Sequence, residues 1–191
     1  MIKIKSSSIF FISLNDLKNY LPGSIVHGRI GLIPYYVEDN VKNYIINVSN
    51  KGLYSDFGGG ISKKEHPYYD GLKRELNEEC PVWSKYILEK IESNDLVVDL
   101  SSNIDISENK VSISKPLTIL CREFNNQTTK YILLLVEVDK CMIDSFKISK
   151  EVKELHVLKS FELYKLVNFS HKINNGLMQL KLANKGRLIR I

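Results

Sequence analysis

Apolar residues recur along this chain with two different periods, which predict both strands and helices. Extended segments are expected where apolar residues alternate with polar ones or run without a break between turn-forming residues. These segments are 2–5, 8–14, 26–37 with an interruption near Pro34, 44–48, 52–57, 96–100, 117–124, 131–138 and 154–158. Helices are expected at 15–20, 69–80 and 84–91, and again where Ile173, Leu177 and Leu180 recur at helical spacing. The polar, serine-rich stretch 101–114 predicts a loop or weak hairpin, and 144–153 a helix or loop. This order of elements predicts a mixed α/β sandwich.

The length and composition are those of one ordinary globular domain. The chain has 191 residues, of which 43% are hydrophobic and 26% are charged, enough to bury a core of its own. No internal repeat or linker divides it. We therefore predict a single domain over 1–191, with an N-terminal addition at 1–22 and a basic C-terminal helix or tail at 163–191. Trp83 is expected to pack at the junction between two helices rather than to stack on a base.

The sequence also bears on where the protein works. No apolar run approaches the roughly 20 residues of a membrane-spanning helix. The apolar stretch 9–14 is cut short by polar residues, so we expect a strand there and not a signal peptide. Three cysteines, Cys80, Cys121 and Cys141, form neither a paired framework nor a metal-binding Cys-x-x-Cys. They predict a reducing, cytoplasmic location, with the thiols buried as small apolar groups.

Positive charge is concentrated towards the C-terminal end. The formal net charge is +5, and no acidic residue follows Glu162. The basic residues beyond it are Lys165, Lys172, Lys181, Lys185, Arg187 and Arg190. A basic end beside a phosphate-handling site predicts salt-sensitive contacts with a polyanion such as RNA. The alternative is a solvated helix face in a chain that is rich in lysine and asparagine throughout.

The segment 58–79 carries the candidate chemistry. Three successive glycines, 58–60, predict a flexible turn that leads into helix 69–80. On that helix Glu75, Glu78 and Glu79 stand at i, i+3 and i+4, so they share one face and repel one another unless a cation lies between them. Carboxylate oxygens suit Mg²⁺ or Mn²⁺, and such a metal is the usual partner of a phosphate substrate. A Glu-Glu pair taken alone is more often a solvated helix face.

At these residues the chain resembles the Nudix hydrolases. Their signature is a glycine, five residues, a glutamate, seven residues, Arg-Glu, an aliphatic residue, any residue, Glu-Glu, any residue, a glycine and an aliphatic residue. The matching residues here are Gly59, Glu65 and Arg74-Glu75-Leu76-Asn77-Glu78-Glu79. Eight residues instead of seven separate Glu65 from Arg74, and Pro81 replaces the closing glycine. We expect a loop before the helix to absorb the extra residue. Pro81 cannot take a left-handed conformation, so the helix must end differently.

This resemblance implies a fold and a metal site. The fold would be a Nudix-like mixed β-sheet sandwiched between helices. Glu75 and Glu79 would bind Mg²⁺ or Mn²⁺ directly, and Glu78 would be either a further ligand or the base that takes a proton from water. The carbonyl of Gly59 would complete the coordination sphere.

The resemblance also implies supporting residues around the metal. Arg74 would hold the carboxylates in place through paired hydrogen bonds, with Glu65 as its anchor. Family members often add a carboxylate from a later loop, for which Glu151 is the first candidate and Glu154 the second, with a solvated charge as the alternative for both. His66 lies in the signature loop, either touching phosphate or exposed.

Three functions are compatible with these residues. The first is a metal-dependent Nudix hydrolase that cleaves the pyrophosphate bond of a nucleoside diphosphate linked to another moiety, with an RNA 5′ cap as one candidate because of the basic C-terminal end. The second is a pyrophosphatase acting on a small substrate such as a nucleoside triphosphate, a dinucleotide polyphosphate or an inositol pyrophosphate. The third is a Nudix-fold binding module without turnover, which the two departures favour and the filled acidic positions oppose. The oligomeric state leaves no trace in the sequence.

Overall fold

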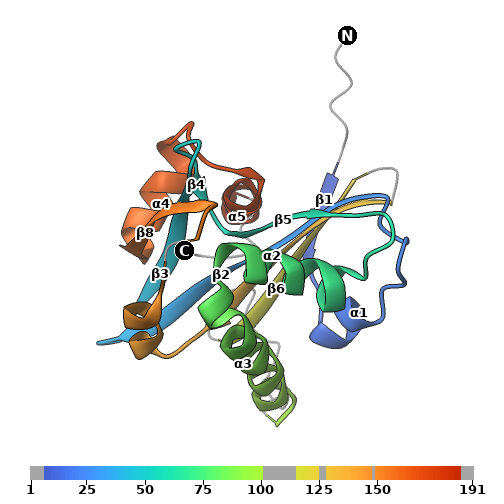
Figure 1. Ribbon diagram of the computed structural model, residues 1–191, viewed down its shortest axis with the longest axis horizontal. Coiled ribbons are helices and arrows are strands. Elements are labelled where there is room, and N and C mark those ends of the chain that lie inside the picture. Colours follow the sequence, from blue (N-terminus) through green and yellow to red (C-terminus); the bar gives the residue numbers. More distant parts are fainter. Residues whose placement is uncertain (1–6, 101–114, 125–127, 148, 186–191) are drawn as a thin grey trace.

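A mixed β-sheet organises the part of the chain that the computed structural model describes, residues 7–100, 115–124, 128–147 and 149–185 (Figure 1). Within these residues the sheet has eight strands. Six follow one another in the order β1-β6-β7-β2-β3-β4, while β5 pairs with β2 and β8 with β3. The strands are β1 (Ser7–Phe11), β2 (His27–Glu38), β3 (Val41–Ser49), β4 (Tyr54–Ser55), β5 (Phe57–Ile61), β6 (Leu117–Phe124), β7 (Thr129–Glu137) and β8 (Val152–Lys159). Among these eight strands of the described residues, only β2 and β7 pair in parallel.

The long strand β2 sets up the site because its partners change along its length. On one side it pairs with β7 from His27 to Tyr35, and on the other its first half pairs with β5, up to Leu32 opposite Phe57. Its second half pairs with β3, beginning at Tyr35 opposite Tyr44. Pro34 lies between these two pairings, so its missing N–H costs no hydrogen bond to β5 or to β3. The strand is therefore continuous through Pro34, and β5 and β3 diverge from it at that point.

Both faces of the sheet are buried. Successive residues of β2, Leu32 and Ile33, belong to two different hydrophobic clusters, and so do Leu134 and Leu135 of β7. Alternate side chains of a strand point to opposite faces. A sheet covered on both sides therefore needs apolar residues at every position, which is why these strands appear in the sequence as unbroken apolar runs.

Helices cover the two faces. On one face lie α1 (Leu14–Lys18), the π-helical turn η1 (Pro67–Leu72), α2 (Lys73–Glu79) and α3 (Pro81–Leu100), together with the 3₁₀ turn η2 (Lys140–Ser145). On the other lie α4 (Ser160–Phe169) and α5 (Asn175–Lys185) (Figure 1). This arrangement confirms the predicted fold class, a mixed sheet between helices. No helix in the described part of the chain combines the length and apolar character needed to cross a membrane.

The C-terminal helices are part of the core. The buried side chains that they contribute are Leu163, Val167, Leu177, Leu180 and Ala183. The segment 172–174 also pairs with β4, since Tyr54 bonds to the backbone on both sides of Ile173. Removing the basic end of the chain would thus remove core residues, so its charge has to be tested by single substitutions.

Several predicted boundaries were wrong. The expected strand 96–100 is the end of α3, because no glycine or proline follows Ile91 to stop the helix. The expected strand 52–57 contains only the two-residue strand β4 and the first residue of β5. The glycine segment 58–60 is not a flexible turn but lies inside β5, paired with β2. The segments 2–5 and 101–114 lie outside the described residues.

Two of the three cysteines are buried, and all three are free thiols. Cys80 and Cys121 lie in the core, where burial raises the pKa of both thiols. The prediction that all three are buried was wrong for Cys141, which is exposed on η2 beside the inward-facing Met142. Among these three thiols, Cys141 is the one that a reagent in solution can reach.

Alkylation should therefore distinguish these cysteines. Iodoacetamide added to the native protein is expected to attach once, at Cys141, as read by intact-protein mass spectrometry. The Cys141→Ser variant should remain unlabelled until the protein is unfolded. A second rapid label on the native protein would contradict the burial of Cys80 and Cys121.

Candidate active site

The carboxylate-bearing helix begins earlier than predicted and contains a π-helical turn. η1 spans Pro67–Leu72 and continues directly into α2. The N–H of Gly71 donates to the carbonyl of His66, five residues back, at 3.0 Å. A turn closed over five residues holds one residue more than an α-helical turn. The extra residue of the signature is thus absorbed inside the helix and not, as expected, in a loop before it.

His66 begins this helix and is buried, contrary to both expectations for it. Its Nδ1 accepts the N–H groups of Tyr68 and Tyr69, each at 3.1 Å. Its Nε2 lies 3.1 Å from the carbonyl oxygen of Lys18. Both ring nitrogens are engaged by backbone, so His66 caps the helix and neither faces solvent nor offers a free nitrogen to phosphate.

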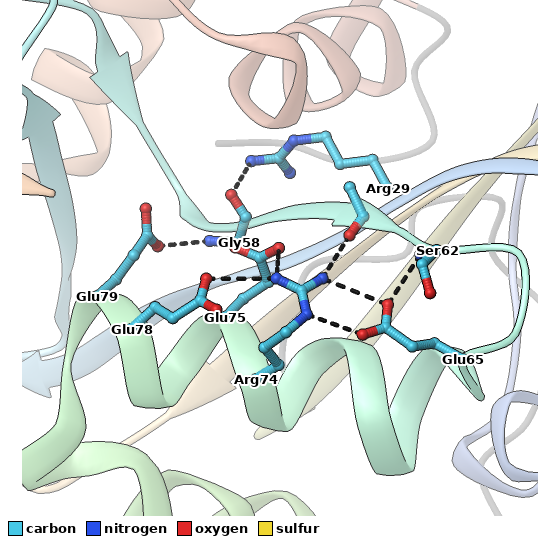
Figure 2. A network of polar contacts seen from close by, with 9 residues as sticks. Arg29, Gly58, Ser62, Glu65, Arg74, Glu75, Glu78 and Glu79 are labelled. Carbon is cyan, nitrogen blue, oxygen red and sulfur yellow. Dashed lines mark hydrogen bonds and ion pairs between the residues drawn. The ribbon is translucent and has the colours of Figure 1, made fainter.

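Arg74 is the centre of a polar network that joins most of the signature residues (Figure 2). Its Nε and Nη2 donate to the two oxygens of Glu65, at 2.8 and 3.3 Å, and Nη2 also donates to the carbonyl of Gly60 at 2.7 Å. Its Nη1 donates to Glu75 at 2.6 Å and to Glu78 at 3.3 Å. The bond to Glu65 raises the pKa of Arg74 and lowers the pKa of Glu65. The structure therefore brings these residues together in spite of the eight-residue spacing.

Glu75 and Glu79 lie against the glycine strand β5. They are only 7% and 8% exposed. The N–H of Gly58 donates to Glu79 Oε2 at 2.7 Å (Figure 2). A Cβ atom on Gly59 would lie 2.4 Å from both carboxylate oxygens of Glu75. Glycine at this position is what allows the helix carboxylates to approach the strand so closely.

Burial leaves negative charge in this site incompletely compensated. Burial raises the pKa of Glu79 to about 8, and the nearby charge of Asp56 adds to the effect. Burial also raises the pKa of Glu75, although the hydrogen bond from Arg74 opposes it. The side chain of Glu78, on the same helix, is exposed. The site therefore favours additional positive charge, and carboxylate oxygens of this kind fit a hard divalent cation.

The helix ends without the closing glycine, as expected. Cys80 terminates α2 with φ −143° and ψ 62°, and Pro81 opens α3, where its missing N–H has no helical partner to lose. Trp83 is buried in the corner between the two helices, as predicted. Its Nε1 donates to Ser145 Oγ at 3.0 Å, and its ring centre lies 4.6 Å from that of Phe146.

A buried ion pair supports the glycine strand. Arg29 of β2 is 8% exposed and Asp56 is fully buried. The guanidinium donates two hydrogen bonds to Asp56, from Nη1 at 2.6 Å and from Nη2 at 2.5 Å. Its Nη2 also donates to the Gly58 carbonyl at 2.8 Å. Burial lowers the pKa of Arg29, but the charge and hydrogen bonds of Asp56 outweigh burial, so the pKa is raised overall. The peptide groups of Gly58 are thus held by Arg29 at the carbonyl and by Glu79 at the N–H (Figure 2).

Asn174 joins this ion pair to helix α5. Its Nδ2 donates to Asp56 Oδ1 at 2.7 Å, while its Oδ1 accepts the N–H of Leu177 at 3.1 Å in the first turn of α5. The Asp56 carboxylate fits only because two neighbours lack side chains. A Cβ atom on Gly31 or Gly176 would lie 2.2 Å from it.

Sequence reasoning missed Arg29, Asp56 and Asn174. The available signal was a single arginine inside the apolar strand 26–37, because a charge within a buried strand needs a buried partner. Nothing in the sequence indicated which acid that partner was, since Asp56 lies 27 residues away.

The later candidate carboxylates lie apart from this network. Glu151 is exposed and directly precedes Val152, which pairs with Ser49 at the end of β3. Glu154 is also exposed, with its carboxylate 3.4 Å from His156. Neither joins the hydrogen bonds of Arg74 within the described residues.

The carboxylates of α2 are engaged with protein groups and do not converge on one point. Among the described residues, no three His, Cys, Asp or Glu side chains could hold a metal ion as they stand. Glu75 and Glu78 are turned to Arg74, and Glu79 is turned to Gly58. The ligand roles of these residues, of the Gly59 carbonyl and of Glu151 stay predictions.

Comparison with known proteins gives only distant likeness. No protein-family model and no curated protein sequence matches the chain. Among solved structures, an Ap4A hydrolase of C. elegans in a binary complex aligns over 84% of this chain and 99% of its own, with 14% identity and a TM-score of 0.42. The NUDIX domain of Shewanella oneidensis NrtR, complexed with ADP-ribose, aligns over 93% and 99%, with 11% identity and a TM-score of 0.44. Likeness at this level does not carry an activity from those proteins to this one.

Proposed function

We propose that the chain is a metal-dependent pyrophosphohydrolase of the Nudix type. Its substrate would be a nucleoside diphosphate linked to another moiety, with the 5′ cap of an RNA as the specific candidate. The observation that carries this proposal is the network in which Arg74 binds Glu65, Glu75 and Glu78. The π-helical turn keeps Arg74 opposite Glu65 although one residue has been added between them. The two departures from the signature therefore give little support to a module that has lost catalysis.

Mg²⁺ or Mn²⁺ would be held by Glu75, Glu79 and the exposed Glu78, with the Gly59 carbonyl as a further donor. Buried carboxylates with raised pKa values support this choice, because a divalent cation would compensate charge that the protein leaves unbalanced. When bound, such a cation neutralises pyrophosphate oxygens and acidifies a water molecule.

The chain's own residues would orient the carboxylates and move the proton. Arg74 fixes the direction of Glu75 and Glu78, and Glu65 in turn fixes Arg74. Glu78 is the more exposed of the site acids. It therefore remains the candidate either to bind the cation or to accept the proton of the attacking water.

A substrate panel tests this proposal. The intact protein is incubated with capped RNA, nucleoside triphosphates, dinucleotide polyphosphates and an inositol pyrophosphate, in Mg²⁺ and in Mn²⁺, and products are separated by chromatography. We expect capped RNA to release a nucleoside diphosphate, and the Glu78→Gln variant to lose that release about 10²–10⁴-fold if Glu78 is the base. Glu89→Gln, which changes an exposed acid on α3, is the matched control.

The other outcomes decide between the alternatives. Hydrolysis of small pyrophosphates with no action on capped RNA would support a pyrophosphohydrolase and reject the RNA cap as its substrate. No turnover of any pyrophosphate would reject the enzyme and favour a binding module.

A further inference from the structure

The outer face of α4 carries three exposed aromatic side chains. Phe161, Tyr164 and Phe169 are 65%, 39% and 73% exposed. The opposite face of the same helix buries Leu163 and Val167 completely. A ten-residue helix is therefore apolar on both sides, although only one side packs against the sheet. Exposed aromatic residues gathered in this way mark an interaction surface.

A lysine shares this face with the aromatic rings. Residues three and four apart are neighbours on a helix, which places Tyr164 and Lys165 beside Phe161. The Nζ atom of Lys165 lies 4.4 Å from the ring centre of Phe161, a cation–π contact. We call Phe161, Tyr164, Lys165 and Phe169 the α4 face.

The stretch of chain that contains the α4 face is positively charged. Between residues 159 and 185 the chain has five lysines and one acid, Glu162. Glu162 accepts the N–H of Lys159 at 2.8 Å and so serves as a helix cap. Lys159 at the start of α4 and Lys172 after its end are both exposed. α4 lies on the flank of the molecule, with its outer side open (Figure 1).

We propose that the α4 face binds single-stranded RNA. Unpaired bases stack on exposed aromatic rings, and lysines beside the rings contact the phosphates. A duplex keeps its bases stacked on one another and would leave the three rings unused. A second copy of this chain would bring the same lysines against each other, which like-charge repulsion disfavours. A flexible, unpaired polyanion complements both features of the surface.

This inference deepens the proposed function, and it rests on that function for the meaning of bound RNA as substrate. The binding itself is a property of a different surface from the carboxylate site. It can therefore be measured with uncapped RNA in EDTA, where no hydrolysis contributes.

The test is fluorescence anisotropy with a labelled, uncapped RNA of about 12 nucleotides, within the range of such sites. Phe161→Ala and Phe169→Ala should each weaken binding about tenfold, while Phe161→Tyr retains it. Lys165→Gln should reduce the slope of log K against log salt by about 0.7. Leu21→Ala, at another exposed apolar residue 72% exposed, is the control and should change nothing. All four positions are exposed, so circular dichroism should show the same fold.

Two results would overturn the inference. One is equal RNA affinity in the intact protein, Phe161→Ala and Phe169→Ala. The other is a change of oligomeric state in those variants by analytical ultracentrifugation with unchanged RNA affinity, which would assign the α4 face to self-association. RNA binding that persists while all pyrophosphates stay intact would reject the proposed function and leave the binding site standing.

Discussion

Replacing Glu79 with glutamine should lower substrate turnover about a thousandfold. The substitution keeps the shape of the side chain and an oxygen that can accept the N–H of Gly58. It removes only the negative charge, which is the property that a divalent cation requires. Steady-state hydrolysis of whichever pyrophosphate the intact protein cleaves measures the loss.

The same variant should change how the protein responds to cations. Mn²⁺ at about 100 times its Kd should stabilise the intact protein by about 2.7 kcal/mol. Without metal and above about pH 8, Glu79→Gln should be at least as stable as the intact protein, because burial disfavours the ionised carboxylate that it replaces. With Mn²⁺ the order should reverse. Thermal unfolding in EDTA and in Mn²⁺ measures both.

Glu89→Gln controls for the loss of one negative charge, since Glu89 is an exposed acid on the neighbouring helix α3. It should match the intact protein in turnover and in both melting experiments. Equal stabilisation of Glu79→Gln and the intact protein by Mn²⁺ would show that Glu79 is not a ligand.

Much of the fold was predictable because both faces of the sheet are buried. Strands such as β6 and β7 need apolar residues at nearly every position, and the sequence shows this as unbroken runs. The same signal misled at 96–100, where β-branched and leucine residues end the helix α3. A short apolar run is compatible with either a strand or a helix. At 96–100 the segment is helical because α3 continues through it.

The sequence identified the residues of the candidate site but not the backbone conformation around them. The spacing of Glu75, Glu78 and Glu79 requires only that the segment be helical. The glycines looked like a turn because their conformational freedom is a local property. Their role in the structure is to bring β5 close to Glu75, which depends on a helix that follows them in the chain.

The support beneath the site depends on long-range contacts. Arg29, Asp56 and Asn174 come from three separate segments of the chain and share no motif spacing. A single sequence indicates that a buried charge needs a partner, but it does not indicate which residue that partner is. This is also where we expect a substitution to affect stability most strongly.

Replacing Arg29 with methionine should lower the free energy of unfolding by about 3–5 kcal/mol. Asp56 would remain fully buried, and Asn174 would still donate to Oδ1. Oδ2 would lose the bond from Arg29, and the carboxylate would have no counter-charge. Urea unfolding measures the loss. Lys85→Met, which removes a cation from an exposed pair on α3, is the control and should cost less than about 1 kcal/mol.

A second substitution separates the charge from the packing. Asp56→Asn in the Arg29→Met protein should restore part of the lost stability, because a neutral amide needs no counter-charge and the two effects are coupled. The stability of Arg29→Lys should lie between those of the intact protein and Arg29→Met, since an ammonium keeps the charge but lacks the planar fork that binds both Asp56 oxygens. If Arg29→Met costs no more than Lys85→Met, the pair does not stabilise the strand. If the double variant regains stability but not Mn²⁺ affinity, the Arg29 bond to Gly58 is needed to hold the strand in the position that Glu79 requires.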